Sequence, residues 1–323
     1  MKRQWMHSIL FFVVISLILA SAGFWFDRYS MSLPMYHSYV PKRIGATYMT
    51  LNNPFFEIID DSMRDQLEKR GYHLVSLDPA LNLEIQIEQI EYFIEKDMDA
   101  IVINPVEYAG LKEVLQKAKK AKIPVFTIDT DVLYEDLVTY TISSDNYDAG
   151  VQCAKDLMKQ VDEANILLLR HTSAKSAQER IQGFVDTIQK EPKYQIVSDL
   201  DCHGQLEYAM PLVENYLRQT PNVDCIMALN DPSALGALAA LEAVGPFEDV
   251  LVYGVDGTPD TKRLIHEHRM RATVAQSPKT MGKRMAEVIH MYFQGKTIPS
   301  SEVERVFLIT EENIDQYSLE DWQ

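Results

Sequence analysis

The sequence predicts an α/β protein with parallel sheets, and three observations support this fold class. Short apolar runs of strand length alternate with longer segments whose apolar residues recur at helical spacing. The alternation begins at residue 43 and starts again near residue 150, which indicates two similar halves. The length of 323 residues also suits about two domains. Helices that alternate with apolar strands are typical of βαβ units, in which the strands run parallel.

The first such unit shows the pattern clearly. Ile44–Met49 is an apolar run followed by the turn-forming residues 52–54, which predicts a buried strand and then a loop. A helix is expected next, with apolar residues at helical spacing as far as Leu67, and Gly71 ends it. Residues 52–54 either serve the turn alone or also offer side chains to a ligand.

The same alternation continues to the end of the chain. Further strands are expected at 73–77, 99–104, 124–129, 138–142, 165–170, 196–200, 225–230, 250–256, 272–276 and 305–309. Further helices are expected at 83–96, 108–121, 150–161, 176–189, 206–218, 232–244, 259–266 and 279–293.

Composition narrows the function classes. A formal net charge of −16 disfavours nucleic-acid binding, which requires a basic surface. The 3 cysteines form no CxxC pattern and have no histidine pair at metal spacing, so we expect neither a metal site nor a cofactor. A disulfide between Cys202 and Cys225 is left open.

Residues 1–26 are expected to be a targeting segment. Lys2 and Arg3 precede an uncharged apolar run at 9–26, a pattern typical of secreted or membrane-anchored proteins. The positive end stays inside the cell, so the rest of the chain is expected outside the cytoplasm. Residues 27–42 lack periodicity and are interpreted as a linker.

Two interpretations of this segment compete. Residues 20–22, Ala-Ser-Ala, match a signal-peptidase site, so the segment could be removed. Alternatively, Trp5 and Trp25 would lie about 30 Å apart along a helix, which suits the two aromatic belts of a membrane-spanning anchor. We favour the retained anchor.

Polar side chains of one chemical kind follow the predicted strands. Parallel sheets bring the carboxyl ends of their strands to one edge, and two such edges facing each other form a cleft. Amides and carboxylates there can hold hydroxyl groups, and Phe55 and Phe56 offer flat apolar faces to C–H groups. Arg180 adds guanidinium donors from a helix of the second half. The strand-end residues are Asn53, Asn104, Asp129, Asn146, Asn230, Asp256 and Gln276.

A series of short motifs lies in a fixed order along residues 43–295. They are LNNPFF, INP, TID, SSDN, ERIQGF, LNDPSALGAL, GVDGTPD and ATVAQ. Together they resemble the ribose-binding-protein branch of the type I periplasmic sugar-binding family. The resemblance implies two Rossmann-like lobes, joined by a three-segment hinge, that close on a sugar without catalysis, for ABC import or chemoreception.

The resemblance also implies lobe boundaries and site residues. The N-terminal lobe is expected at 43–147 plus 275–305, and the C-terminal lobe at 148–274 plus 306–323. With the strand-end residues included, the expected ligand-binding set is Asn53, Phe55, Phe56, Asn104, Asp129, Ser144, Asn146, Arg180, Asn230, Asp256 and Gln276.

The chain departs from the family pattern at three positions. Thr130 stands where ribose binders carry a second arginine, and His203 is nearest to the expected aromatic residue of the second lobe. Val255 replaces a phenylalanine. Because of these departures, ribose is not specifically expected. The expected ligand is a pentose, a hexose or a polyol.

The resemblance implies a monomer that binds a monosaccharide and works with a membrane permease. A retained anchor would also suit a partner that is a sensor kinase or a chemoreceptor. An enzyme of the sugar-hydrolase type would use Asp129 and Asp256 as a carboxylate pair. The sequence has no G-x-G-x-x-G, P-loop or G-x-S-x-G motif, so we expect no enzyme. A sugar-responsive repressor would need a basic helix-turn-helix at residues 1–26, where the run is apolar instead.

Overall fold

The computed structural model describes residues 15–22, 25, 41–220, 222–245 and 249–322. The chain divides into two units, 1–41 and 42–323. In the first unit, residues 15–22 are helical and exposed. No helix within the described ranges is long and apolar enough to cross a membrane. Apart from residue 25, the remainder of the expected targeting segment lies outside the described residues, as does most of the 27–42 linker.

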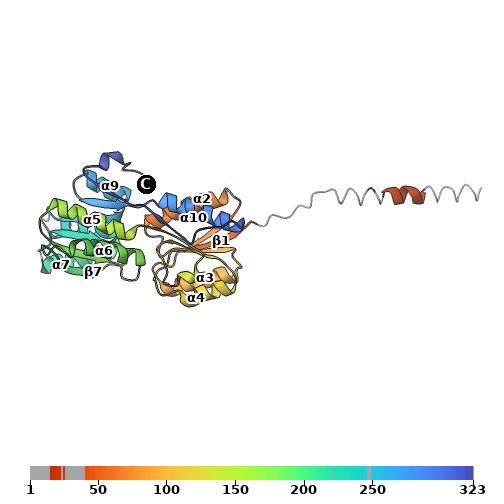
Figure 1. Ribbon diagram of the computed structural model, residues 1–323, viewed down its shortest axis with the longest axis horizontal. Coiled ribbons are helices and arrows are strands. Elements are labelled where there is room, and N and C mark those ends of the chain that lie inside the picture. The colour runs from red at the N-terminus through yellow and green to blue at the C-terminus, as the bar shows by residue number, and fades with distance from the viewer. Residues whose placement is uncertain (1–14, 23–24, 26–40, 221, 246–248, 323) are drawn as a thin grey trace, which may run out of the picture. The chain divides into compact units, whose positions relative to one another are not determined.

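The second unit contains two six-stranded sheets, each with its own helices (Figure 1). The first sheet has the order β11-β5-β4-β3-β1-β2, and its paired strands all run parallel. Its strands are β1 (Arg43–Thr47), β2 (His73–Leu77), β3 (Ala100–Ile103), β4 (Val125–Asp129), β5 (Tyr140–Ser144) and β11 (Ser301–Glu304). Its helices are α2 (Pro54–Glu68), α3 (Leu83–Glu95), α4 (Lys112–Lys120) and α10 (Pro278–Phe293). The pair α2 and α10 covers one face, and α3 and α4 cover the other.

The second sheet has the order β12-β10-β9-β8-β6-β7. Its strands are β6 (Ala164–Arg170), β7 (Tyr194–Asp201), β8 (Cys225–Ala228), β9 (Leu251–Asp256), β10 (Ala272–Ala275) and β12 (Phe307–Thr310). Its helices are α5 (Asn146–Gln160), α6 (Lys175–Ile188), α7 (Leu206–Gln219), α8 (Asp231–Val244) and α9 (Pro259–His266). Helix α5 packs on α6, and α7 packs on α8.

The central strands are apolar on both faces because helices cover both sides of each sheet. Every residue of β3, β8 and β10 is buried, which explains their continuous hydrophobic runs. The predicted fold class, two α/β lobes with parallel sheets, is therefore confirmed.

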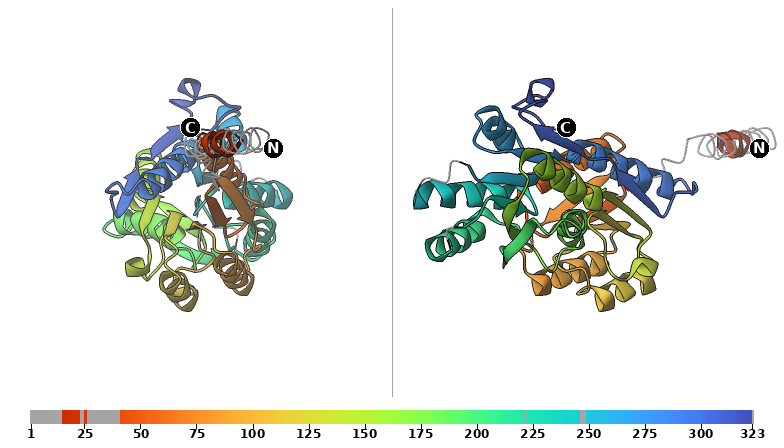
Figure 2. Two further views of the ribbon diagram at one scale, coloured as in Figure 1. Left: turned by 90° about the vertical axis from the view of Figure 1, so that its right-hand side faces the viewer. Right: turned by 60° about the vertical axis from the view of Figure 1, so that its left-hand side comes forward.

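The chain passes between the two sheets three times: after β5, after β10 and after β11. The expected three-segment connection is thus present, and the C-terminal part of the chain contributes to both lobes (Figure 2). One short 3-10 turn, η1 (Glu135–Leu137), lies between β4 and β5, and another, η2 (Ile314–Gln316), follows β12.

Two details of the sheets differ from the prediction. Strand β11 was not expected, because its sequence Ser-Glu-Val-Glu carries two charges on an edge strand. Strand β12 pairs with β10 in the antiparallel direction, so the second sheet is mixed and not purely parallel. The Cys202–Cys225 alternative is also settled, because Cys153, Cys202 and Cys225 are all free and buried.

Candidate functional site

A small cavity of about 30 Å³ lies between the two lobes, where strands of both sheets end. Asp129 is the last residue of β4, Asp256 is the last residue of β9, and Gln276 directly follows β10. The residues that line the cavity are Met49, Asn53, Phe55, Phe56, Asp129, His171, Ala174, Ser176, Ala177, Arg180, His203, Gly204, Gln205, Leu229, Asn230, Asp256 and Gln276. The carboxyl ends of parallel strands are the usual ligand position in such folds.

Arg180 lines the cavity and is almost fully buried. Its Nε donates to Asn146 Oδ1 at 2.8 Å, and one terminal nitrogen donates to the Leu229 carbonyl at 3.1 Å. The terminal nitrogens also lie 3.8 Å from Asp129 Oδ1 and 3.7 Å from Asp256 Oδ1. The guanidinium therefore stands between one carboxylate from each lobe.

A close helix crossing fixes the position of Arg180. A Cβ on Gly150 of α5 would lie 1.8 Å from the Arg180 carbonyl, and a Cβ on Gly183 of α6 would lie 2.0 Å from the Tyr147 carbonyl. The two helices can meet at this distance only because both positions lack a side chain. Asn146, the first residue of α5, is thereby brought to the Arg180 guanidinium.

The two carboxyl groups have unusual acidities. Burial raises the pKa of Asp129 to about 6, although the Arg180 charge and a hydrogen bond from Asn104 act in the opposite direction. Burial also raises the pKa of Asp256 well above its ordinary value, and the nearby Asp231 charge adds to this. Burial therefore disfavours the ionised form of both carboxyl groups. A hydrogen-bond donor from a ligand would stabilise that form.

The backbone at both residues is also unusual. Asp129 has φ of +69° and Asp256 has φ of +142°, in the left-handed half of the map that L residues rarely adopt. Each such conformation costs on the order of 1–3 kcal/mol and persists where the surrounding structure enforces it. Both residues line the cavity.

Three buried acceptor atoms of this cavity accept no hydrogen bond from any residue that the structure describes. They are Asp129 Oδ1, Asp256 Oδ2 and Gln276 Oε1. The opposite atoms of these groups are used: Gln276 Nε2 donates to Asp256 Oδ1 at 2.7 Å, and Asn104 Nδ2 donates to Asp129 Oδ2 at 3.2 Å. Buried polar atoms are rarely left unpaired, so these three acceptors indicate a ligand that supplies hydrogen-bond donors.

The first-lobe wall combines a capping amide with two aromatic rings. Asn53 Oδ1 accepts from the Phe55 amide at 3.0 Å and caps α2. The side-chain oxygen of Asn53 therefore serves the turn, as one of the two interpretations of residues 52–54 predicts. Phe55 and Phe56 are buried and meet edge to face, with ring centroids 5.5 Å apart. Asn230 caps α8 in the same way, and its Nδ2 donates to the Gly204 carbonyl at 3.0 Å.

Three of the expected ligand-binding residues lie behind the cavity wall and do not line it. Asn104 is fully buried, and its side chain bonds the Met49 amide as well as Asp129. Asn146 holds Arg180, as described above. Ser144 Oγ faces Met281 Sδ of α10 at 3.9 Å.

The second lobe contributes two histidines that the expected set did not include. His171 directly follows β6 and is buried, and its ring meets the His203 ring edge to face at 5.7 Å. Burial lowers the pKa of His171 to about 4, so its ring is neutral near pH 7. His171 has the same position after a strand as the expected amide and carboxylate residues, and it differs from them only in side-chain chemistry.

The other departures from the family pattern have structural explanations. Thr130 Oγ1 accepts from the Ser176 amide at 2.9 Å, so it joins the two lobes directly. Val255 is fully buried within β9, beside Val274 of β10. Thr130 therefore serves closure of the lobes, and Val255 serves packing of the sheet.

Further contacts show that the lobes are closed. The Tyr108 amide donates to the Ser173 carbonyl at 2.9 Å, and Asn52 Nδ2 donates to Glu207 Oε1 at 3.2 Å. Each bond joins a residue of the first lobe to a residue of the second. Among the described residues, no group of three or more His, Cys, Asp or Glu side chains could hold a metal ion.

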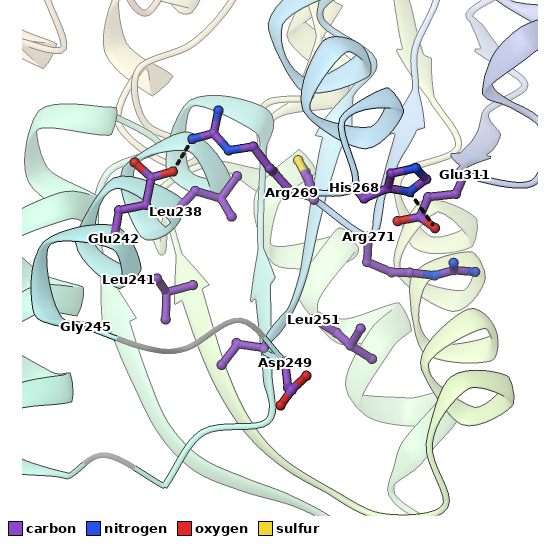
Figure 3. Close-up of a pocket in the computed structure, with 12 residues that line it drawn as sticks. Leu238, Leu241, Glu242, Gly245, Asp249, Leu251, His268, Arg269, Arg271 and Glu311 are labelled. Carbon is purple, nitrogen blue, oxygen red and sulfur yellow. Dashed lines mark hydrogen bonds and ion pairs between the residues drawn. The ribbon is translucent and has the colours of Figure 1, made fainter.

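A larger hollow of about 750 Å³ lies in the second lobe (Figure 3), but its chemistry is different. It is lined by residues at the starts of β9 and β10, including Leu251 and Arg271, which is the edge opposite to the strand ends. Several of its charged groups are paired, as in the Glu242–Arg269 and Glu311–His268 contacts. The interlobe cavity is therefore the better candidate site.

Comparisons with known proteins agree with this geometry. The model of the family described as "Periplasmic binding protein domain" matches residues 44–297. The ribose import binding protein RbsB of Salmonella typhimurium is 31% identical over 257 residues, which cover 79% of this chain and 86% of that protein. The galactofuranose-binding protein YtfQ of Escherichia coli is 28% identical over 246 residues, which cover 73% of this chain and 77% of that protein.

Solved structures share the fold. A solute binding protein of an ABC transporter from Bacillus halodurans, with bound myo-inositol, superposes with a TM-score of 0.80 at 26% identity. That match covers 85% of this chain and 96% of the other.

Proposed function

We propose that this chain, which belongs to the periplasmic binding protein family, binds one neutral polyhydroxyl molecule, a monosaccharide or a cyclic polyol, between its two lobes. The cavity of about 30 Å³ marks this site, and the lobes separate further than in this structure to admit the ligand. The lobes close on the ligand and release it unchanged. Relatives named for ribose and galactofuranose, and a similar structure with bound myo-inositol, support this ligand class.

The observation that carries the proposal is the set of acceptors without donors: Asp129 Oδ1, Asp256 Oδ2 and Gln276 Oε1. Hydroxyl groups can donate to all three while their oxygens accept from Arg180. The Phe55 and Phe56 rings would pack against the C–H faces of the same molecule.

The charges of the cavity favour a neutral ligand. Two carboxyl groups face one guanidinium, and the neighbouring His171 is neutral near pH 7. A phosphate or a sugar acid would add negative charge beside Asp129 and Asp256 with only Arg180 to compensate. Sugar phosphates and uronic acids are therefore expected to bind far more weakly than the parent sugars.

A hydrolase that used Asp129 and Asp256 as a carboxylate pair is the second candidate. Arg180 lies between the two groups and within 4 Å of both, so it holds them as charge partners. Such an arrangement suits binding better than proton transfer, in which one carboxyl group must be free to give up a proton.

The test is a thermal-shift panel on the full chain. It contains D-ribose, L-arabinose, D-galactose and myo-inositol, with ribose 5-phosphate and galacturonate as the charged counterparts. A ligand at 100 times its Kd stabilises a protein by about 2.7 kcal/mol, which is readily measured. We expect at least one neutral compound to raise Tm and to be recovered unchanged.

A matched control separates the cavity from the larger hollow. Glu242→Gln changes a charge in the hollow of Figure 3 and should leave the shift intact. Gln276→Leu removes one of the three free acceptors and should reduce it. Consumption of the sugar would support the hydrolase, and a response to the charged compounds alone would refute the neutral-ligand proposal.

The biological role of the ligand-bound form depends on where the two lobes lie in the cell. We place the two lobes outside the cytoplasm, where the closed form would be recognised by an ABC permease. The apolar run at 9–26 would anchor the chain in the membrane, and an anchored protein would also suit a sensor kinase or chemoreceptor. Fractionation of cells, with N-terminal sequencing of the mature chain, tests the anchor: a soluble product that begins after residue 22 would exclude it.

A further inference from the structure

The C-terminal segment Ser318–Trp322, which we call the strap, contacts both lobes. It follows η2 and lies beside α9 of the second lobe, near α10 of the first (Figure 1). Tyr317, Leu319 and Trp322 pack against the main hydrophobic core. The strap is therefore an integral part of the folded unit.

The second-lobe end of the strap is held by a buried lysine. Lys262 of α9 is fully buried, and its Nζ donates to the Ser318 carbonyl at 2.6 Å and to the Asp321 carbonyl. A buried ammonium group needs acceptors because its desolvation is costly. The strap carbonyls supply them, so the strap and α9 depend on each other.

The first-lobe end is held by an ion pair and a ring contact. Lys279, at the start of α10, pairs with the Asp321 carboxylate. The Trp322 ring lies on Phe55 with centroids 6.0 Å apart and planes inclined by 57°. Phe55 is 1% exposed and lines the interlobe cavity, so Trp322 contacts it from behind the wall.

These contacts span one of the three crossings between the lobes. The chain leaves the second sheet at the end of β10 and enters α10 at Pro278, with Gln276 of the cavity between them. Lys262 and Lys279 lie on opposite sides of this crossing, and Asp321 contacts both. In this closed arrangement the strap therefore bridges the two lobes beside the crossing.

We propose that Trp322 is a positioning residue of the binding cleft: through the strap it holds Phe55 in place and favours the closed arrangement of the lobes. The effect on affinity rests on the proposed function, whereas the effect on closure does not. The ion pair is the minor component, because the Asp321 side chain is 64% exposed and exposed pairs contribute little. The ring contact and the buried Lys262 are the major components.

Closure can be measured without a ligand. The backbone hydrogen bond from the Tyr108 amide to the Ser173 carbonyl, 2.9 Å across the cleft, keeps the two Cα atoms within the range of a disulfide, so a variant that carries both Tyr108→Cys and Ser173→Cys forms a disulfide only when the lobes close. The three native cysteines are buried and should not interfere. The rate of disulfide formation in oxidised glutathione then reports the closed population.

In this background, Trp322→Ala should slow disulfide formation about tenfold, because a smaller competent fraction lowers the rate in proportion. Trp322→Phe keeps an aromatic ring against Phe55 and should restore the rate to within about twofold. Lys262→Met removes the donor to the strap carbonyls and should slow the reaction as well. Thermal unfolding of each variant checks that it is folded.

An unchanged rate in Trp322→Ala and in Lys262→Met would overturn the proposal, as would equal slowing in Trp322→Ala and Trp322→Phe. The same variants without the added cysteines are then titrated with D-ribose and myo-inositol. If neither compound binds the native chain while Trp322→Ala still slows closure, the strap is retained and the ligand class fails. If a compound binds the native chain and Trp322→Ala equally well, the positioning role of Trp322 fails alone.

Discussion

The two walls of the cleft are built in different ways. The first-lobe wall rests on packing: Asn53 caps α2, and the capped helix places Phe55 and Phe56 in the core, where their rings also meet the cavity. The second-lobe wall rests on buried polar groups that depend on one another, with Arg180 beside Asp256. A change in the first wall should therefore remain local, whereas a change in the second should disturb several groups together.

The strongest test of this difference is Arg180→Met. The change leaves Asp129 and Asp256 buried without their common partner, which should lower the free energy of unfolding by about 3–5 kcal/mol near pH 7 and abolish ligand binding. Chemical denaturation and calorimetric titration measure the two effects.

The matched control is Arg64→Met in the first lobe. Arg64 pairs with Asp60 at 2.8 Å, but its side chain is 32% exposed, so we expect a loss of about 1 kcal/mol and unchanged binding. If the two variants lost equal stability, Asp129 and Asp256 would not depend on Arg180 more than an ordinary partly exposed ion pair depends on its arginine.

Gly150→Ala sharpens the comparison through the backbone. The added methyl group would lie 1.8 Å from the Arg180 carbonyl, so α5 and α6 must separate and Asn146 must withdraw from the guanidinium. We expect a loss of about 2–3 kcal/mol, measured by denaturation, together with weaker binding. Gly295→Asn is the control, because a Cβ there meets nothing within 4 Å and asparagine tolerates its φ of +69°.

The pH dependence should have opposite signs for the two walls. In the first, the pKa of Asp129 is raised to about 6, so the folded state binds more protons than the unfolded state between about pH 4 and 6. This contribution to stability is present at low pH and is lost as the pH rises through 6. In the second, the pKa of His171 is lowered to about 4, so stability is lost as the pH falls from about 6.5 to 4.

Two variants separate these contributions. The unfolding free energy of the native chain minus that of Asp129→Asn should decrease by up to roughly 3 kcal/mol as the pH rises from 4 to 7. The corresponding difference for His171→Gln should rise over the same range. Urea denaturation at several pH values measures both, and slopes of the same sign would contradict the assignment.

The strand pattern predicted the architecture because strands that are buried on both faces of a sheet consist of continuous apolar runs, which the sequence shows directly. The same rule indicated Asp129, Asn230, Asp256 and Gln276, which follow or end strands and line the cavity. It could not tell these residues from Asn104 and Asn146. A strand end fixes the edge of the sheet, but the direction of a side chain depends on its backbone angles and on its neighbours.

The features that sequence reasoning missed depend on tertiary contacts. His171 has the strand-end position but not the expected side-chain chemistry. Strand β11 has alternating exposed residues and no apolar run, because it lies at a sheet edge. The strap contacts of Trp322 join residues more than 250 positions apart in the sequence, and no local pattern encodes them.

The smallest expected effect lies where the two walls meet, at Thr130. Thr130→Val keeps the side-chain shape but leaves the Ser176 amide without its acceptor, and only in the closed form. An unpaired buried amide costs about 1–3 kcal/mol, so calorimetric titration should show affinity reduced at least about fivefold. Asn52→Ala removes another cross-lobe hydrogen bond, but that bond is exposed to solvent, so its effect on affinity should stay below about twofold. A larger effect from Asn52→Ala than from Thr130→Val would mean that closure is governed by the rim of the cleft and not by the contact between its buried walls.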